Sequence, residues 1–460
     1  MTSFFRRISF QKTKKTPTPS ANPSTEQVVG ATAAVTVTPE VEQEQSPLPT
    51  PETQTVLLLH AARQPYQLTE NYPVPQVQGE HEVLVRTQAI GLNPIDWKAP
   101  DFNFAIPELP YISGRELAGE VVQRPNEKSR LKARDRVLVI STDYRDLRKA
   151  TYQEYVVAFD YNTVRLPPSI SPEEGSTLGV AFVAAALALG VCMGVDFSSV
   201  LDGPDLFTLV RKIAPELLAE DVRGECLDGI AGHERAVAGD WLAIWGGSST
   251  SANLTIQLAK LAGLKTIAVV DKAKHGLRLA NHTSIRTDLL VDSHDPQRAV
   301  DIIRSNLKGK LRFGIDTRGR DTATTLLQAL SPSNLATPSL PSAAAGGDET
   351  ASDVGDAPPS PPATPHDSTQ LSAHLIGLTG LPKQSAPEGA VFHTVPIKLF
   401  HEVPEIGGAL VQWLERLLAQ GLVAPPEIID VEQGLGSINK GLDRMRKGEI
   451  SGGKLVVRVA

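Results

Sequence analysis

The sequence predicts an α/β protein in which a doubly wound parallel sheet follows a smaller, β-rich region. Residues 239–260 run from an apolar strand through a turn of small residues into a helix. The alternation of strands and helices then continues to residue 378, whereas the region before residue 160 reads as short strands punctuated by Pro and Gly. Alternation of this kind is typical of a parallel sheet covered by helices.

The strand-turn-helix segment indicates a dinucleotide-binding site. We expect a buried strand at Trp241–Trp245, a tight turn over residues 246–252 and a helix over residues 254–261. Small residues in such a turn let a pyrophosphate approach the free backbone N–H groups and the positive end of the helix dipole. The candidate cofactor-binding residues here are Gly246, Gly247, Ser248, Ser249, Thr250 and Ala252.

Gly246, Ser249 and Ala252 hold the three small-residue places of a G-x-x-G-x-x-G pattern, and two of them are not glycine. On its own the pattern also fits a tight turn in any α/β protein. The strand-helix units that follow favour the dinucleotide site. These units are a helix at 278–280, a strand at 289–291, a helix at 298–305, a strand at 311–316, a helix at 322–330 and a strand at 373–378.

The choice of cofactor rests on three residues after the second strand, residues 266–270. That strand ends in Asp271, where a carboxylate can accept both ribose hydroxyls and thus favours NADH. Lys272 and Lys274 follow, and they could pair with a 2′-phosphate if Asp271 turned aside. The sequence leans to NADPH and leaves NADH open.

Composition fits a globular protein of two domains with tails. The 460 residues are 41% hydrophobic and 21% charged, and the net charge of −7 gives no footprint for nucleic acid or an anionic membrane. The most apolar stretch, residues 178–195, is interrupted by glycines and predicts a buried helix, so we expect no integral membrane segment. Cys192 and Cys226 are the only cysteines, so neither a disulfide framework nor a four-cysteine zinc lobe can form.

Two low-complexity stretches are predicted to lie outside the fold. Residues 1–52 form a tail, and residues 331–370, rich in Pro, Ser, Ala and Gly, form a loop insertion in the nucleotide-binding region. The first 25 residues are basic, rich in Ser and Thr and free of acids, as in a mitochondrial presequence, although early prolines would stop an amphipathic helix. Cytoplasm and mitochondrial matrix both stay open.

The β-rich region carries a family resemblance. We expect its strands near residues 56–59, 82–89, 117–122, 136–140 and 152–157. The blocks AIGLNPIDWK (89–98), LPYISGRELAGEVV (109–122), ARDRVLVI (133–140) and YQEYVVA (152–158) resemble the GroES-like catalytic domain of medium-chain dehydrogenases/reductases, and GEISGGKLVVRV (448–459) continues in that order. The resemblance covers residues 53–460 apart from insertions near 201–238 and 331–370.

This resemblance implies four segments: a tail at 1–52, the first part of the GroES-like domain at 53–175, a Rossmann NAD(P)-binding domain at 176–423, and a return to the first domain at 424–460, with strands near 427–431 and 455–459. It places the active site in a cleft between the two domains.

Zinc-dependent relatives hold a catalytic zinc through a cysteine and a histidine in two of these blocks. Here Pro94 and Arg115 stand in those places, and Glu116 alone cannot complete a tetrahedral site. The chain therefore resembles the zinc-free quinone-reductase and fungal trans-acting enoyl-reductase branch. That resemblance implies hydride transfer from NAD(P)H to an activated C=C bond of an enoyl thioester or enone, or to a quinone. It implies a small-molecule substrate and a polyketide synthase or acyl-carrier partner; no oligomeric state is indicated.

The resemblance also suggests catalytic residues. Asn93 is the candidate for positioning the nicotinamide or the substrate carbonyl, although an Asn before Pro also caps turns. Lys98 is the candidate donor to a thioester oxygen, with a solvated lysine as the alternative. Mitochondrial enoyl-thioester reductases carry an acid tyrosine where this chain has Phe104, and Tyr111 reads as the start of a buried strand, so protonation by Lys98 or water is expected. Gly319, in a strand-end D-x-x-G block, is expected to border the nicotinamide.

The histidines predict no metal site, because His60, His81, His233, His393 and His401 show no metal-ligand spacing. We therefore expect a chain without zinc. A second function stays open: a cofactor-binding protein of the same fold with weak catalysis, which uses the 331–370 insertion and the basic tail for interaction or sensing.

Overall fold

The computed structural model describes residues 48–124, 129–331, 333–334 and 370–459. Contacts divide the chain into Met1–Gln45 and Ser46–Ala460, and the description below concerns the second unit. Residues 1–47 of the predicted tail and most of the predicted 331–370 insertion thus lie outside the described residues. The last residues of the predicted tail instead join the fold, because the Leu48 amide donates to the Val122 carbonyl at 3.2 Å and the Glu52 carbonyl accepts from the Val74 amide at 3.1 Å. At the borders of the insertion, β13 (Ser333–Asn334) and β14 (Gln370–Leu371) pair antiparallel.

A six-stranded sheet forms the nucleotide-binding part. Its strands are β9 (Trp241–Trp245), β10 (Lys265–Val270), β11 (Leu289–Asp292), β12 (Phe313–Asp316), β15 (Ala373–Gly377) and β16 (Ala390–His393). All neighbours pair parallel in the order β11-β10-β9-β12-β15-β16. This order reverses direction between β9 and β12, which is the doubly wound arrangement that the alternation predicts.

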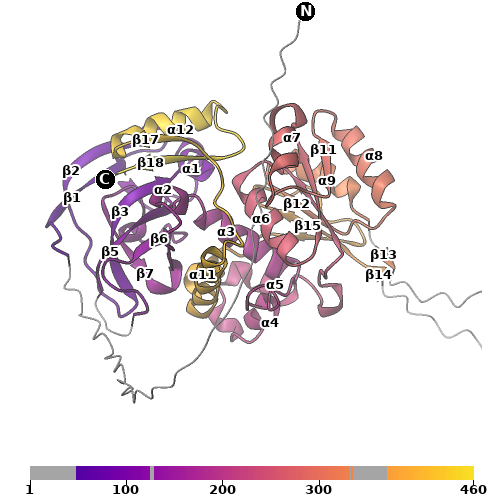
Figure 1. Ribbon diagram of the computed structural model, residues 1–460, viewed down its shortest axis with the longest axis horizontal. Helices are drawn as coiled ribbons and strands as arrows, with labels where there is room; N and C mark the ends of the chain where they lie inside the picture. Colours follow the sequence, from indigo (N-terminus) through magenta and orange to yellow (C-terminus); the bar gives the residue numbers. More distant parts are fainter. Residues whose placement is uncertain (1–47, 125–128, 332, 335–369, 460) are drawn as a thin grey trace, which may run out of the picture. The chain divides into compact units, whose positions relative to one another are not determined.

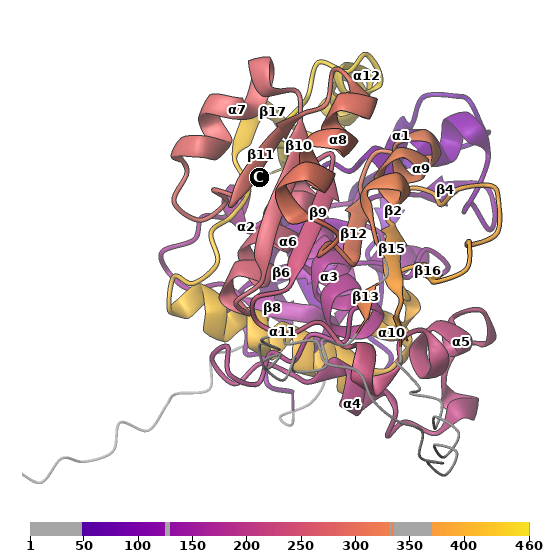
Figure 2. The ribbon, with the colours of Figure 1, turned by 90° about the vertical axis from the view of Figure 1, so that its right-hand side faces the viewer.

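Helices cover both faces of this sheet, as Figure 2 shows for α6 and α8. One face packs against α3 (Gly179–Leu187), α6 (Thr250–Leu261) and α7 (Lys272–Asn281). The other face packs against α8 (Pro296–Leu307) and α9 (Arg320–Ala329). The helix expected at 278–280 is longer than predicted, because Asp271 caps it six residues earlier by accepting a hydrogen bond from the Lys274 amide.

The GroES-like part is built around a second sheet. Its path is β17-β18-β3-β5-β6-β8, β7 pairs with β3, and β2-β1-β4 form a separate small sheet. The strands are β1 (Thr53–Leu59), β2 (Gln67–Pro73), β3 (Glu82–Gly91), β4 (Tyr111–Ile112), β5 (Glu116–Gln123), β6 (Arg136–Ile140), β7 (Tyr155–Phe159), β8 (Thr163–Arg165), β17 (Ile428–Gln433) and β18 (Lys454–Arg458).

The strand predicted at 152–157 begins later, at Tyr155. Residues 152 and 153 instead pair with β1, because the Leu57 amide donates to the Tyr152 carbonyl at 2.9 Å and Gln153 forms an isolated bridge with Val56. An alternating apolar pattern does not tell which sheet a strand joins. The pairing of residues 152 and 153 with β1 could therefore not be predicted from the sequence.

The remaining helices connect strands of both parts. They are α1 (Pro94–Phe102), α2 (Pro172–Gly175), α4 (Leu206–Val210), α5 (Glu220–Asp228), α10 (Lys398–Glu402), α11 (Pro404–Ala419), α12 (Ile438–Arg446), the single turns η1 (Leu147–Lys149), η2 (Asp160–Asn162), η4 (Pro215–Leu217), η5 (Gly232–Glu234) and η6 (Leu435–Ser437), and a π turn, η3 (Ala188–Cys192). The predicted insertion at 201–238 contains α4 and α5.

The apolar run predicted as a buried helix forms α3 and η3 in the core. The segment Pro172–Cys192 is long and apolar enough to cross a membrane, but 89% of its most apolar window is buried inside the protein. It packs with α11 in one hydrophobic cluster that reaches both sheets, from Leu138 on β6 to Leu242 on β9. Cys192 and Cys226 are both buried and free.

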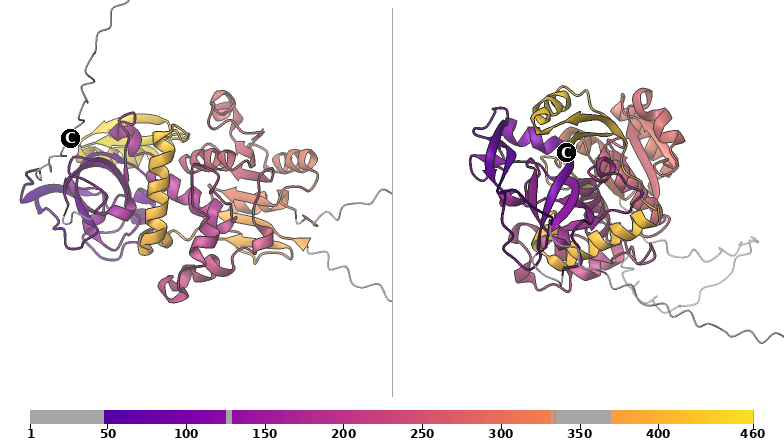
Figure 3. Two further views of the ribbon diagram at one scale, coloured as in Figure 1. Left: turned by 60° about the horizontal axis from the view of Figure 1, so that its bottom comes forward. Right: turned by 60° about the vertical axis from the view of Figure 1, so that its left-hand side comes forward.

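The chain returns to the first sheet after α11, as predicted. Figures 1 and 3 show the yellow C-terminal strands β17 and β18 beside the indigo and purple strands of the first part. β18 pairs antiparallel with β3, so Val457 lies opposite Ile90. This pairing places Lys454, the first residue of β18, close to the start of α1.

Candidate functional site

The turn after β9 is shaped for a close backbone approach. Gly246 has φ of +81°, and a Cβ there would lie 2.3 Å from the Thr317 hydroxyl, so only glycine fits. Its amide donates to the Val269 carbonyl on β10 at 3.0 Å. The turn is therefore held against both neighbouring strands, at the point where the strand order reverses.

Ser249 begins α6 as its N-cap. Its hydroxyl accepts from the Ala252 amide and donates to the Thr317 hydroxyl, both at 3.1 Å. Within the described ranges, the amides of Ser248, Thr250 and Ser251 donate to no protein acceptor. Free N–H groups at a helix N-terminus are the elements of a phosphate site, so this turn fits a dinucleotide pyrophosphate.

The loop after β12 completes the other wall of this turn. Asp316 is fully buried, and its Oδ1 accepts from the amides of Arg318 and Gly319 at 2.9 and 2.7 Å. Burial raises the pKa of Asp316. Gly319 has φ of +154° and caps α9, and a Cβ there would meet nothing within 4 Å. The backbone of this loop therefore has open space on the side where a ligand would lie.

Asp271 stands at the end of β10, as expected, but its carboxylate is partly occupied. Its Oδ1 accepts from the Lys274 amide at 2.9 Å, and its Oδ2 lies 3.7 Å from His294 Nε2. Lys272 and Lys274 are exposed.

A second carboxylate, which was not predicted, lies beside Asp271. Asp292 is the last residue of β11, and its Oδ1 accepts from the Lys272 amide and from His294 Nδ1, both at 3.1 Å. The hydrogen bond with Asp292 raises the pKa of His294. The ribose end of the site therefore contains two carboxylates, two lysines and one histidine.

Asn93 lies in a buried polar cluster that joins the two ends of the described chain. Its amide donates to the Gly91 carbonyl at 3.2 Å and to Glu116 Oε1 at 2.9 Å, and its Oδ1 accepts from Lys454 Nζ at 2.7 Å. Lys454 Nζ also pairs with Glu116 Oε1 at 2.5 Å. With both amide hydrogens occupied, the Asn93 side chain is placed to support the start of α1.

Glu116 connects this cluster to the core helix. Its Oε2 accepts from the Val180 amide at 2.9 Å, in the first turn of α3, where the helix dipole favours a negative charge. Both carboxylate oxygens of Glu116 thus accept from protein donors.

Arg115 occupies the place of the family's zinc-ligand histidine with a buried positive charge. Only 7% of Arg115 is exposed, and Asp96 nearby is fully buried. Burial raises the pKa of Asp96 to about 6, while the charge of Arg115 acts to lower it. Pro94, at the other ligand position, is the first residue of α1. A guanidinium at this point repels a divalent cation and offers no lone pair.

Comparison with known proteins agrees with this fold. Residues 79–168 match the family model described as the alcohol dehydrogenase GroES-like domain. Over 401 residues the chain is 28% identical to trans-enoyl reductase BOA5 of Botryotinia fuckeliana (strain B05.10), which covers 85% of this chain and 96% of the relative. A trans-enoyl reductase of Gibberella fujikuroi is 26% identical over 392 residues, with 84% and 93% covered. The chain belongs to the medium-chain dehydrogenase/reductase superfamily.

Solved structures share the fold of this oxidoreductase. A putative NADPH:quinone reductase from Bacillus thuringiensis superposes with a TM-score of 0.62 at 16% identity, covering 89% of this chain and 99% of the other. An alcohol dehydrogenase superfamily protein from Novosphingobium aromaticivorans gives a TM-score of 0.61 at 16% identity, with 89% and 100% covered. The CurK enoyl reductase gives 0.59 at 14% identity, with 88% and 99% covered.

Of the two predicted catalytic residues, Asn93 and Lys98, only Lys98, on α1, has a side chain that is not already hydrogen-bonded within the described ranges. It is half-buried, its Nζ lies 5.7 Å from the centre of the Trp97 ring, and it forms no hydrogen bond or ion pair within the described ranges. Phe104 is 44% exposed just beyond α1. Tyr111 is buried at the start of β4, as predicted, and its hydroxyl has no partner among the described residues.

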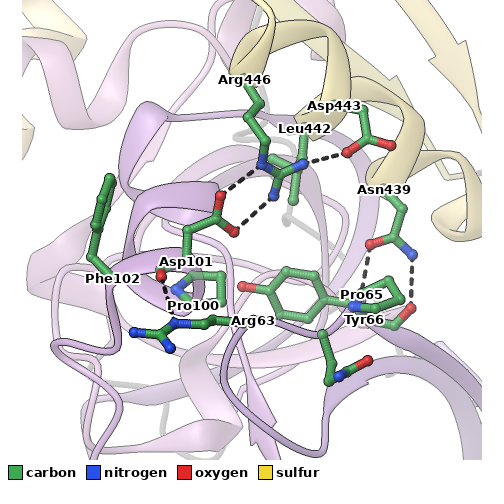
Figure 4. A pocket seen from close by; sticks show the side chains of 11 residues that line it. Arg63, Pro65, Tyr66, Pro100, Asp101, Phe102, Asn439, Leu442, Asp443 and Arg446 are labelled. Atoms are coloured by element: carbon green, nitrogen blue, oxygen red, sulfur yellow. Dashed lines mark hydrogen bonds and ion pairs between the residues drawn. The ribbon is translucent and has the colours of Figure 1, made fainter.

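A pocket of about 650 Å³ lies beside α1 in the GroES-like part. Figure 4 shows Arg446 of α12 pointing to Asp101 of α1, with the Tyr66 ring below them. Arg446 pairs with both oxygens of Asp101, at 2.7 and 2.9 Å, and the Asn439 side chain holds the Tyr66 backbone. All the residues that line the pocket belong to the GroES-like part. The pocket is therefore separate from the turn that fits the dinucleotide.

One cluster departs from the expectation that the histidines make no metal site. The ligand-type atoms of Cys192, Glu225 and His393 all lie within 4.8 Å of one another. These residues lie on η3, on α5 and at the end of β16, far apart in the sequence. No spacing rule could have found them, because the sheet and the 201–238 insertion bring them together.

Proposed function

We propose that this protein is a zinc-independent, NADPH-dependent oxidoreductase that transfers a hydride to an activated C=C bond of an enoyl thioester or enone, with quinones as a second substrate class. The observation that carries the proposal is the buried guanidinium of Arg115 in the zinc-ligand position, together with the free amides at the start of α6. The names of the trans-enoyl reductase relatives support the choice of substrate.

The dinucleotide would be held by residues already described. The amides of Ser248, Thr250 and Ser251 would donate to the pyrophosphate, and the backbone at Gly319 would border the nicotinamide half. The nicotinamide, when bound, supplies a hydride. The protein has to hold the acceptor in line with it and to stabilise the oxygen on which negative charge develops.

NADPH is the proposed form of the cofactor. Asp271 caps α7 and lies near His294, so its carboxylate is not free to accept both ribose hydroxyls without losing these partners. Lys272 and Lys274 are exposed beside it and can each offer a charge-assisted hydrogen bond to a 2′-phosphate. Asp292 opposes this preference, and His294 between the two carboxylates reduces its effect.

Lys98 is the proposed donor to the carbonyl oxygen, either directly or through water. A lysine without a protein partner keeps its donors available, whereas Phe104 has no proton to give. Asn93 is proposed as a positioning residue, since its amide fixes Lys454 and Glu116 at the start of the helix that carries Lys98.

The proposed partner is a polyketide synthase or an acyl carrier that presents the thioester, as the resemblance to fungal trans-acting enoyl reductases implies. The alternative of a cofactor-binding protein with weak catalysis is tested by the same experiment. Purified protein is mixed with NADPH and a panel of enoyl thioesters, enones and quinones, and NADPH consumption and the reduced product are measured.

Sustained turnover with an enoyl thioester or enone is the expected outcome. Lys98→Ala should lower kcat, and Lys440→Ala, a matched change of an exposed lysine on α12, should leave kcat unchanged. Binding of NADPH without turnover on any member of the panel would reject the enzymatic proposal in favour of the sensing alternative.

A further inference from the structure

A cluster of possible metal ligands lies at the edge of the nucleotide-binding sheet, and the 201–238 insertion covers this edge. Cys192 ends η3, Glu225 is on α5, and His393 is the last residue of β16. Cys192 and His393 are fully buried, and 14% of the Glu225 side chain is exposed. Three kinds of ligand atom, one thiol, one carboxylate and one imidazole, therefore meet under one helix.

The three side chains are already within reach of a single ion. Their ligand-type atoms all lie within 4.8 Å of one another, and Glu225 Oε1 is 2.8 Å from His393 Nδ1. Bonds of about 2.0 to 2.3 Å in a tetrahedral zinc site separate ligand atoms by roughly 3.4 to 3.6 Å. Side-chain movements of about 1 Å would convert the observed arrangement into that geometry.

A second histidine supports the first. His374 Nδ1 lies 2.9 Å from His393 Nε2, and His374 Nε2 is buried without a hydrogen-bond partner, 3.9 Å from Glu234 Oε2. Two neutral rings carry two N–H hydrogens for the three contacts along the line Glu225, His393, His374 and Glu234, so one contact has no hydrogen.

Without an ion, this line of hydrogen bonds leaves the buried His374 Nε2 without a partner. If Glu225 accepts the Nδ1 hydrogen of His393, then His393 Nε2 accepts from His374 Nδ1, and the bare Nε2 lone pair of His374 faces the Glu234 carboxylate. A buried acceptor that faces another acceptor is costly. If an ion takes the Nδ1 lone pair of His393 instead, the hydrogens move so that His374 Nε2–H points toward Glu234, and the unpartnered atom gains an acceptor.

We propose that Cys192, Glu225 and His393 form a zinc site, with His374 and Glu234 orienting the His393 ring. Zinc favours thiolate and imidazole ligands, and a histidine that binds zinc commonly donates its other N–H to an oriented acceptor. One thiolate and one carboxylate neutralise a divalent cation, which suits a buried site. A water molecule completes the coordination on the side of Glu225, which is the exposed edge.

Binding is balanced by release of a proton. Zinc displaces the proton of the Cys192 thiol into solvent, no electron is transferred, and the imidazole of His393 stays neutral. The site ties the insertion helix α5 to η3 and to the edge strand β16, and its role is to fasten the insertion to the sheet.

The test uses the purified full-length chain and two metal ions alone. After chelation and dialysis, the protein is titrated with zinc and measured by elemental analysis, and separately with cobalt(II) and measured by absorption. We expect one equivalent of zinc per chain, a thiolate-to-cobalt charge-transfer band and the visible bands of tetrahedral cobalt. Absence of both the zinc equivalent and the charge-transfer band in the wild-type chain would overturn the proposal, without the need for any variant.

Variants locate the site. Cys192→Ser should lose the charge-transfer band, whereas Cys226→Ser, the matched change of the other buried cysteine, should keep it. His374→Ala should weaken zinc affinity by roughly 10- to 100-fold, the usual effect of removing an orienting partner. Zinc should raise the Tm of the wild type and of Cys226→Ser but not that of Cys192→Ser. Loss of the band in Cys226→Ser with retention in Cys192→Ser would place the metal elsewhere and reject the assignment.

Discussion

Lys454 Nζ donates to Asn93 Oδ1 at 2.7 Å, so the last strand of the described chain is tied to the first residue of α1's capping turn. Glu116 completes the group, and all three side chains are buried. The resulting cluster fixes the start of the helix that presents Lys98.

Removing the Lys454 ammonium should therefore lower the free energy of unfolding substantially. Lys454→Met leaves the Glu116 carboxylate buried with no cation, and breaking a buried pair in this way costs roughly 3–5 kcal/mol. Lys440→Met is the matched control, because Lys440 forms an exposed pair with Glu432 that contributes roughly 0.2–1 kcal/mol. Urea denaturation measures both, and equal losses in the two variants would contradict the structural role of Lys454.

Asp96 makes stability depend on pH in a defined direction. Burial raises the pKa of Asp96 to about 6 from its ordinary value of 3.8, so the native state binds this proton more tightly than the unfolded chain does. The free energy of unfolding should therefore decrease as pH rises from about 3.8 to about 6, by at most about 3 kcal/mol from this group. Asp96→Asn keeps an acceptor for the Asn93 amide and removes the titration.

The measurement is the slope of stability against pH, from denaturation curves of wild type and Asp96→Asn. The stability of the variant relative to wild type should rise through this window and level off above it. Parallel curves for the two proteins would show that Asp96 does not titrate there.

Ser249 separates steric effects from capping effects at the phosphate turn. Ser249→Ala removes the cap of α6 and should cost about 1 kcal/mol of stability with a small effect on the cofactor. Ser249→Leu also places bulk against Thr317, whose hydroxyl lies 3.1 Å from that of Ser249, and should abolish dinucleotide binding. Fluorescence titration with NADPH compares them, and similar affinity in wild type and Ser249→Leu would place the phosphate site elsewhere.

Cofactor preference depends on the side chains around Asp271. Lys272→Ala combined with Lys274→Ala should raise the apparent KM for NADPH much more than that for NADH, because charge-assisted hydrogen bonds contribute about 1.5 to 3 kcal/mol each. Asp271→Ser should improve NADPH binding, and serine still caps α7. A wild-type preference for NADH, or equal losses for both cofactors in the double variant, would mean that Asp271 binds the ribose and the lysines face solvent.

The cleft should need no metal. Steady-state reduction of an enoyl thioester should be unchanged after dialysis against a chelator, because Arg115 and Pro94 leave no ligand set near α1. The Cys192→Ser variant separates this outcome from the proposed zinc site at Cys192, which lies on the nucleotide-binding part. Loss of turnover on chelation with recovery on zinc addition in Cys192→Ser would contradict zinc-independent catalysis.

Local patterns predicted the nucleotide-binding part well. The apolar strand at Trp241–Trp245 matches β9 residue by residue, and Asp271 stands at the end of β10 as expected, because a strand-turn-helix unit is specified by neighbouring residues. Long-range contacts could not be predicted from the sequence. The partners of Asn93 include Lys454, the partner of Asp271 is His294, and the sheet edge brings His393 to Cys192, and none of these pairs has a spacing rule.

The pairing of β18 with β3 also affects how the chain is made. Residues 82–91 leave the ribosome early, but the strand that covers the Ala89–Gly91 end of β3 is synthesised only after the whole nucleotide-binding part. Until then the nascent chain exposes an unpaired strand end, and the polar cluster lacks its lysine. The first domain is thus completed last, and a ribosome that stalls within the second domain would release a chain prone to aggregation.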